Sequence, residues 1–464
     1  MNPAAPDAAF RGLRPGNEVR RKESLAAGGD WIFFRQMIRP LILLGLSLMA
    51  SRPGLAEEVL TAAEFQNQMR TGKLVRRLDS LVDIPAVWSL KPADLDAACK
   101  LPDGVKMEKN PYFNWMTKSR DRAVFMRRPY TNLTVDFSLF DGAVPLEEAV
   151  VDFSDGRLNG ITFSLYNRGD SGEIGRGEFD RRMKLCGQKI GGLLGVRPTT
   201  KKADVTQGLL AEGWVWISQK GMATLEYNPE ALLGRPEFLR LKIAPRDAKG
   251  VFAAAFQSRS TAVKVSDLPK NVVREGGDVF IKGIPMVDQG PKGYCVVATT
   301  QRLLEYYGIP ADQHQIAQVA ESDATKGTNS LAMSEALGKI DYRFKTRFKI
   351  HAMGYEGRLV QVDERKMTVG RDFPQSQFEK VIQKSIDDGI PLLWGLTLGE
   401  YPEEPPIAVQ KGGGHMRMII GYNDATRRLI FTDSWGAGHE MKRMAMDDAY
   451  NASHGLFTMT PTVK

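Results

Sequence analysis

The sequence predicts an α+β fold in two consecutive domains, a smaller one over 57–256 and a second one over 283–464. In the first half, short segments with period-two alternation, such as ITFSLYNRGD, are interspersed with a few helical stretches. In the second half, segments with helical spacing come first and apolar strand segments follow. That order is typical of a domain with helices at one end and an antiparallel sheet at the other.

The composition is that of an ordinary folded protein. The 464 residues are 42% hydrophobic and 25% charged, which is enough to build cores and excludes wholesale disorder. The net charge is +8, and residues 1–56 carry half of it, with eight Lys or Arg against four Asp or Glu. Because the remainder is only mildly basic and has no long Lys/Arg run, we expect no nucleic-acid partner.

Residues 1–56 have the pattern of a targeting segment. The apolar run LILLGLSLMA, residues 41–50, follows two arginines and is too short to cross a bilayer. A basic flank, a short apolar stretch and small residues up to Ala56 are typical of a secretory signal peptide, with Met37 as an alternative start. We therefore expect an exported protein, periplasmic or extracellular, with no integral membrane segment after signal removal. An uncleaved anchor is the alternative interpretation.

Alternation and helical spacing define the elements of the domain over 57–256. TNLTVDFSLFDG and EFLRLKIAP are expected strands, and GWVWISQKGMATLEYN is an expected hairpin. EFDRRMKLCGQKIGGLL is an expected helix that places Cys186 on its apolar face. Trp214 and Trp216 are expected in the core. The half contains no metal or phosphate motif, and two roles stay open for it: a segment that blocks the second domain, or a separate targeting or binding domain.

The domain over 283–464 follows a polar, irregular segment, 257–282, which we predict to be a linker. The expected helices lie at 295–307, 311–322, 328–340 and 373–389. The expected strands are IPLLWGLTL, HMRMIIGYN and RRLIFTDSW. The last two strands are separated by Asp424-Ala425-Thr426, so we expect them to form a hairpin.

Cys295 is the candidate nucleophile. It follows the turn-forming segment QGPKGY and begins a predicted helix, where unpaired N–H groups and the helix dipole favour a thiolate. Such a thiol also needs an imidazole to activate it, a polar group to orient that imidazole and a donor for the oxyanion. Cys99 and Cys186 lie in the first half, where they are either a disulfide pair or separate buried thiols.

All five histidines lie in the second half, and His415 has the best position for a general base. It begins a strand after three glycines, which allow a substrate to approach closely. Asp433 lies eighteen residues later, on the partner strand of the expected hairpin, so it can bond one ring nitrogen and leave the other for Cys295. We expect Trp435 to shield that bond from water, and His314 to be solvated on a polar helix face.

Taken together, these residues resemble a papain-like cysteine peptidase over residues 280–464. The resemblance rests on Gln289, six residues before Cys295, and on the segments GGHMRMIIGYND and FTDSWG, in that order. The GTNSLAM element and the GIPLLWGL strand are most similar to the bacteriocin-leader-processing (double-glycine) branch. Asp433 stands where papain itself has asparagine, but aspartate is usual in that branch.

The resemblance implies a papain-like domain that hydrolyses peptide bonds in a peptide or protein substrate, with no cofactor and no metal. It implies that Cys295 is the nucleophile, His415 the general base and acid, and Asp433 the group that orients His415. Gln289 would form the oxyanion hole with the Cys295 backbone N–H. Two other functions stay open: a cell-wall amidase or acyltransferase that uses the same triad, and a non-catalytic binding protein on a degenerate peptidase fold. The sequence does not predict the oligomeric state.

Overall fold

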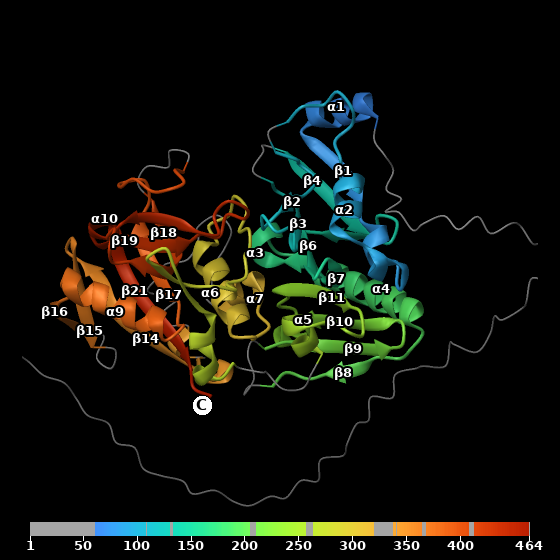
Figure 1. Ribbon diagram of the computed structural model, residues 1–464. Coiled ribbons are helices and arrows are strands. Elements are labelled where there is room, and N and C mark those ends of the chain that lie inside the picture. Colours follow the sequence, from blue (N-terminus) through green and yellow to red (C-terminus); the bar gives the residue numbers. More distant parts are fainter. Residues whose placement is uncertain are drawn as a thin grey trace, which may run out of the picture. The chain divides into compact units, whose positions relative to one another are not determined.

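The computed structural model describes most of the chain beyond residue 60, within one compact unit that spans Arg52–Lys464 (Figure 1). The described residues are 61–107, 109–129, 133–204, 210–256, 263–319, 337–339, 341–363, 368–407 and 413–463. The predicted signal peptide over 1–56, with its alternative start at Met37, lies outside them. So does the predicted helix over 328–340, except for 337–339.

The first half, drawn from blue to green in Figure 1, contains two sheets among its described residues. The larger has eight strands in the order β2-β3-β6-β7-β11-β10-β9-β8, and its neighbouring strands are antiparallel. The smaller has the order β1-β4-β5, with β1 and β4 parallel. The strands are β1 (Lys73–Arg77), β2 (Asn114–Trp115), β3 (Arg122–Met126), β4 (Thr134–Leu139), β5 (Val144–Leu146), β6 (Glu148–Ser154), β7 (Arg157–Asn167), β8 (Thr199–Lys201), β9 (Glu212–Ser218), β10 (Gly221–Tyr227) and β11 (Phe238–Ala244).

The longest described helix of this half, α4, packs on the larger sheet at β9 and β10. Its buried side chains recur at helical spacing and include Cys186, as the sequence predicts. Trp216 is buried and Trp214 is partly buried against the same core. The hairpin predicted in GWVWISQKGMATLEYN is β9–β10. The helices are α1 (Ala62–Thr71), α2 (Pro92–Ala98), α3 (Arg168–Ser171), α4 (Arg176–Leu194) and α5 (Gly250–Ala255), with 3-10 turns η2 (Asp79–Val82), η3 (Ala86–Ser89) and η4 (Pro229–Leu233).

The second half, drawn from yellow to red, has helices first and most of its strands later, and it is α+β as predicted (Figure 1). Eight strands of its ten-stranded sheet follow the order β12-β13-β18-β17-β21-β14-β15-β16, and β19 and β20 continue from β18. Helices α6 and α9 both pack on β18. The elements are η5 (Val265–Asn271), β12 (Val272–Glu275), β13 (Asp278–Ile281), α6 (Cys295–Tyr306), α7 (Gln313–Val319), η6 (Asp341–Phe344), β14 (Thr346–Tyr355), β15 (Arg358–Asp363), β16 (Thr368–Asp372), α9 (Gln375–Asp387), β17 (Leu392–Thr397), β18 (Gly414–Asn423), β19 (Arg428–Thr432), β20 (Lys442–Ala445), α10 (Met446–Ala452) and β21 (Ser453–Pro461).

Part of the predicted linker over 257–282 is regular structure. The hairpin β12–β13 belongs to the sheet of the second half, because β13 pairs with β18. Its turn contains Gly276 and Gly277, both at positive φ, a conformation that glycine adopts without steric cost. A polar composition suggested an irregular segment, but the backbone hydrogen bonds of the hairpin do not require apolar side chains. Residues 257–262 lie outside the described part.

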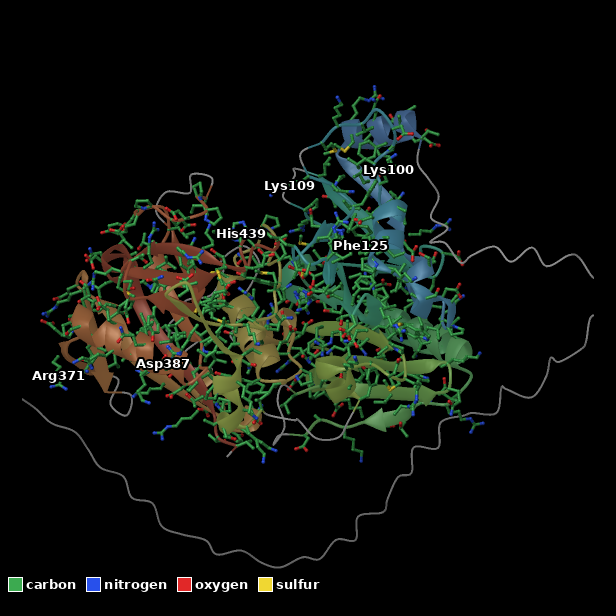
Figure 2. The ribbon with its side chains drawn as sticks, in the orientation of Figure 1. Lys100, Lys109, Phe125, Arg371, Asp387 and His439 are labelled. Carbon is green, nitrogen blue, oxygen red and sulfur yellow. The ribbon has the colours of Figure 1, made fainter. Side chains whose placement is uncertain are left out.

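Each half has its own hydrophobic core. In the first, Phe125, labelled in Figure 2, packs edge to face on Phe137 with ring centroids 5.7 Å apart. In the second, Trp394 and Phe431 have ring centroids 5.5 Å apart and a similar edge-to-face geometry. Both arrangements are favourable for aromatic rings. The second core holds the strands and the helix from which the candidate site projects.

Candidate active site

Cys295 is the first residue of α6, so the helix begins where the sequence predicts. The N–H groups of the first helical turn have no intrahelical acceptor, so this end favours a negative charge. The helix is held in place from inside the core, since nearly all of its residues are buried. The Thr299 hydroxyl donates to the Met416 carbonyl at 3.2 Å, which ties α6 to the strand beside His415.

The hairpin β18–β19 brings His415 and Asp433 together, as predicted. Met418 pairs with Thr432, and extending this register by one residue sets Arg417 opposite Asp433. The His415 Nε2 atom lies 2.7 Å from Asp433 Oδ1. Both side chains are buried, so water does not compete for this bond.

The other nitrogen of the imidazole serves Cys295. The Cys295 thiol and the His415 imidazole are close enough to shift each other's pKa. Because Asp433 occupies Nε2, Nδ1 is the ring nitrogen that remains for Cys295. The main chain of Met416 also helps to lower the pKa of the Cys295 thiol. Trp435 stacks on the imidazole, with ring centroids 4.6 Å apart and planes 22° apart, and thereby covers the ring as the sequence predicts.

The electrostatics favour a thiolate–imidazolium pair. Burial raises the pKa of Cys295, but the hydrogen bond and charge of His415 lower it more, and the net shift is downward. Burial lowers the pKa of His415, whereas the charge and hydrogen bond of Asp433, together with Cys295, raise it to about 9. Burial also raises the pKa of Asp433, but His415 and Arg417 keep it well below its usual range. Each charged form is thus stabilised by a specific neighbour.

Arg417 is a residue of the site that the sequence analysis missed. Its Nε donates to Asp433 Oδ2 at 2.7 Å, so Asp433 has a cationic partner on each carboxylate oxygen. The remainder of the guanidinium binds Glu403, at 2.5 and 3.2 Å, and Lys442 Nζ lies 2.6 Å from the same carboxylate. The side chains of these four residues are at most 5% exposed. An arginine within the apolar strand HMRMIIGYN was the available signal.

Arg302, on α6, is a second residue that the sequence analysis missed. It donates to the carbonyl of Asp433 at 2.8 Å and to the Thr432 hydroxyl at 2.6 Å. Its Nε also donates to the carbonyl of Pro285 at 2.7 Å. One buried side chain therefore fixes the end of β19 relative to the helix that begins with Cys295.

Gln289, predicted to help form the oxyanion hole, is held by the loop after β19. Its main-chain N–H donates to the Ser434 carbonyl at 2.9 Å, and its Oε1 accepts from the Ser434 hydroxyl at 2.6 Å. The Nε2 atom donates to the Lys292 carbonyl at 2.9 Å. An amide nitrogen has two hydrogens, so one remains for a further acceptor. The adjacent Asp288 forms a β-bridge with Trp435, which joins the two loops again.

The prediction that His314 is solvated is wrong. The residue is 3% exposed, and its Nδ1 lies 2.7 Å from Asn167 Nδ2 and 3.4 Å from Asp170 Oδ2. The polar helix face on which it lies packs against polar groups of the first half, a contact that no local pattern reveals. His439, labelled in Figure 2, packs its ring edge on Trp435 with centroids 5.5 Å apart.

The three cysteines are free thiols, so the disulfide between Cys99 and Cys186 is not formed. Both of these thiols are buried, and burial raises the pKa of Cys186. Among the residues that the structure describes, no group of three or more His, Cys, Asp or Glu side chains suits a metal ion. In the same part of the chain, no helix is both long and apolar enough to cross a membrane.

Comparison with known proteins supports a papain-like cysteine peptidase. Residues 281–456 match the model of the family described as "Peptidase_C39 like family". This segment includes Cys295, His415 and Asp433, and its fold is α+β. No curated protein matches the chain.

Among solved structures, the crystal structure of xylellain, a cysteine protease from Xylella fastidiosa, is similar with a TM-score of 0.27 and 11% identity. The match covers 45% of this chain and 94% of that chain. At this TM-score, the similarity gives no information about the site.

Proposed function

We propose that residues 283–464 hydrolyse peptide bonds through Cys295, His415 and Asp433, with Gln289 as an oxyanion donor. The observation that carries the proposal is the buried bond of 2.7 Å between Asp433 and His415, beside a thiol at the start of α6 whose pKa this imidazole lowers. A buried acceptor, an imidazole and a nucleophile in this order form the arrangement needed for nucleophilic acyl transfer. The family match over the same residues supports this reaction class.

Acylation of the enzyme follows from the charges of the pair. The Cys295 thiolate attacks the carbonyl carbon of the scissile bond, and the carbonyl oxygen becomes an oxyanion. This oxyanion accepts from the Cys295 backbone N–H and from the free hydrogen of Gln289 Nε2. The His415 imidazolium then donates its Nδ1 proton to the departing amine nitrogen. The C–N bond breaks, which leaves a thioester on Cys295 and a neutral imidazole.

Deacylation reverses the role of the imidazole. His415, now neutral, takes a proton from water while the water oxygen attacks the thioester carbon. The C–S bond breaks, the acid product leaves, and the thiolate–imidazolium pair is restored. Asp433 holds the ring in place throughout, because its Oδ1 accepts from Nε2 in both protonation states.

The test compares Cys295→Ala with Cys99→Ala in the purified protein. We expect Cys295→Ala to lose at least roughly 10⁴-fold in the rate of hydrolysis of a peptide library, as expected for loss of a nucleophile. It should also lose labelling by an epoxide probe. Cys99→Ala, which removes a buried thiol outside the triad, should keep both. Near wild-type hydrolysis by Cys295→Ala would overturn the assignment. Hydrolysis of cell-wall peptide fragments alone would shift the function to the wall-amidase alternative.

We further propose that the protein acts outside the cytoplasm. The support is the signal-like pattern of residues 1–56, which lie outside the described part of the chain. N-terminal sequencing of the protein from a fractionated bacterial culture tests this proposal. A mature chain that begins near Glu57, in the periplasm or the medium, is the expected result. An intact N-terminus in the cytoplasmic fraction would contradict it.

A further inference from the structure

The loop before Cys295 is bound on one side by the first half of the chain. This loop, residues 286–294, is called here the nucleophile loop. It carries Gln289 and leads directly into α6. Four of its residues contact side chains that come from residues 122–170, more than one hundred positions earlier in the sequence.

The strongest of these contacts is an ion pair between Lys292 and Asp170. Lys292 Nζ lies 2.9 Å from Asp170 Oδ2, and the two side chains are only 10% and 5% exposed. At this depth the pair is little screened by salt. The backbone carbonyl of the same Lys292 accepts the hydrogen bond from Gln289 Nε2 at 2.9 Å. Asp170 is therefore connected to the candidate oxyanion donor through a single residue.

A second contact fixes the residue immediately before the nucleophile. Asn167 Nδ2 donates to the Tyr294 hydroxyl at 3.3 Å and to Asp170 Oδ2 at 3.0 Å. His314, from α7, closes the same cluster from the other side, 2.7 Å from Asn167. The cluster is buried, and the charge of Asp170 is compensated by Lys292.

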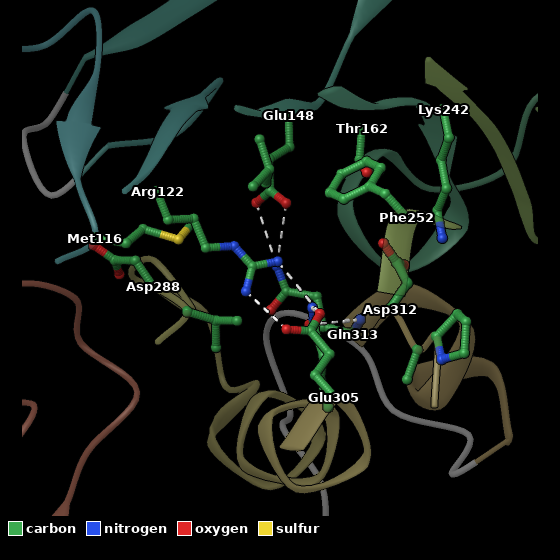
Figure 3. A pocket seen from close by; sticks show the side chains of 15 residues that line it. Met116, Arg122, Glu148, Thr162, Lys242, Phe252, Asp288, Glu305, Asp312 and Gln313 are labelled. Carbon is green, nitrogen blue, oxygen red and sulfur yellow. Dashed lines mark hydrogen bonds and ion pairs between the residues drawn. The ribbon is translucent and has the colours of Figure 1, made fainter. Parts of the chain in front are cut away.

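The upstream end of the loop is also bound. Arg122, on β3, donates to the Met286 carbonyl at 3.2 Å and forms an ion pair with Glu305 of α6 at 2.8 Å. Figure 3 shows this guanidinium bonded to Glu305, in a polar pocket lined by residues of both halves. At Gly290, a Cβ atom would lie only 3.0 Å from the Met126 sulfur, so the first half contacts the loop backbone closely there.

We propose that the first half of the chain is an integral part of the active enzyme, and that Asp170 and Asn167 are positioning residues for Gln289 and the start of α6. This inference rests on the proposed function. It differs from the two roles that the sequence left open, a segment that blocks the site or a separate targeting or binding domain. A removable blocking segment would take Asp170, Asn167 and Arg122 with it, and the nucleophile loop would lose its bonds to these three residues when the segment departed.

The test is a double-mutant cycle in the full chain, with Asp170→Asn, Gln289→Ala and the double variant. We expect Gln289→Ala to reduce kcat by about 10²-fold, as for loss of one oxyanion donor. Asp170→Asn should reduce kcat by about 10-fold, with KM within about 2-fold, because the oxyanion is formed after substrate binding. If Asp170 acts through Gln289, the double variant is no slower than Gln289→Ala. If the loss of kcat in the double variant is the product of the two single losses, the inference is overturned.

The control variant is Asp312→Asn. Asp312 also pairs across the two halves, with Arg240 at 3.4 Å, and it makes no described contact with the nucleophile loop. It lies just before α7 and accepts from the His314 main-chain N–H at 2.9 Å, a bond that the oxygen of an asparagine can keep. It should leave kcat unchanged. Lys292→Met, which removes the other partner of the ion pair, replaces Asp170→Asn in the cycle if that variant does not fold.

A second readout does not depend on peptidase activity. Hydrogen–deuterium exchange of residues 289–294 should accelerate at least about 10-fold in Asp170→Asn and stay unchanged in Asp312→Asn, because exchange reports local opening of the segment. Unchanged exchange in Asp170→Asn would overturn the inference even if activity fell. If the wild-type protein hydrolyses no peptide, the proposed function fails, and the exchange measurement still decides whether Asp170 holds the loop.

Discussion

Replacing Asp433 with asparagine separates the charge of this residue from its hydrogen bond. The asparagine oxygen can still accept from His415 Nε2, but the negative charge 2.7 Å from the ring is lost. The pKa of His415 is about 9 against an ordinary value of 6.5, which corresponds to about 3 kcal/mol in favour of the imidazolium. A neighbouring carboxylate typically shifts a pKa by about one to three, so we expect the pKa of His415 to fall by roughly that amount in Asp433→Asn.

The direction of the effect on activity follows from the role of the imidazolium as the acid for the leaving amine. Hydrolysis is lost as pH rises through the pKa of His415, so a lower pKa moves the alkaline limb of kcat/KM from near pH 9 toward neutrality. Since the imidazolium also lowers the pKa of Cys295, the acid limb should move upward. The profile therefore narrows from both sides, as expected for a coupled pair.

The assay measures kcat/KM on a peptide and, separately, the alkylation rate of Cys295 by iodoacetamide, both from pH 4 to pH 10. Asp447→Asn is the matched control, because it makes the same substitution at an exposed carboxylate that pairs with Arg427. Asp433→Asn should stay folded, because Arg417 keeps Glu403 as a partner, and thermal melting checks this. An unchanged alkaline limb, with a uniform loss of rate at every pH, would refute the electrostatic role given to Asp433.

Two further outcomes follow from burial. Iodoacetamide at neutral pH should modify Cys295 and leave Cys99 and Cys186 intact, because the last two are buried and burial raises the pKa of Cys186. Peptide mass mapping checks this, and comparable modification of Cys186 in the folded protein would contradict it. Arg417→Met should lower the free energy of unfolding by about 3–5 kcal/mol, because it leaves buried carboxylates without their partner. Arg427→Met at the surface should lower it by at most about 1 kcal/mol. Urea denaturation measures both, and equal losses would show that the buried network adds no stability.

Local patterns in the sequence were sufficient for the elements that carry the candidate site. The turn before Cys295 followed by an apolar helix predicted the start of α6, because helix ends have local chemical signatures. The apolar segments around Asp424-Ala425-Thr426 predicted the hairpin that sets His415 near Asp433, because a short turn leaves antiparallel strands little choice of register. The resemblance to papain-like peptidases rested on these same residues, and the family match covers them.

Only the tertiary structure revealed the groups that surround those residues. Arg417 lies two positions from His415, yet its partner Glu403 comes from the connection before β18 and Lys442 from β20. Asp170 is 122 residues from Lys292. An ion pair between distant residues leaves no periodic pattern in the chain, because either partner alone is indistinguishable from a solvated charge.

Contacts between residues that are distant in the sequence also explain why two predictions, the solvated His314 and the irregular linker, differ from the structure. His314 was expected in solvent because its helix face is polar, and it is buried because the opposing surface of the first half is polar too. The polar hairpin β12–β13 was expected to be part of a linker, and it pairs with β18 because backbone hydrogen bonds do not depend on side-chain polarity. Periodicity and turn chemistry along the chain determined the helix that carries the thiol and the hairpin that carries its partners. The packing of one half on the other decided which charges are buried and what holds the nucleophile loop, since those contacts join residues that are neighbours only in space.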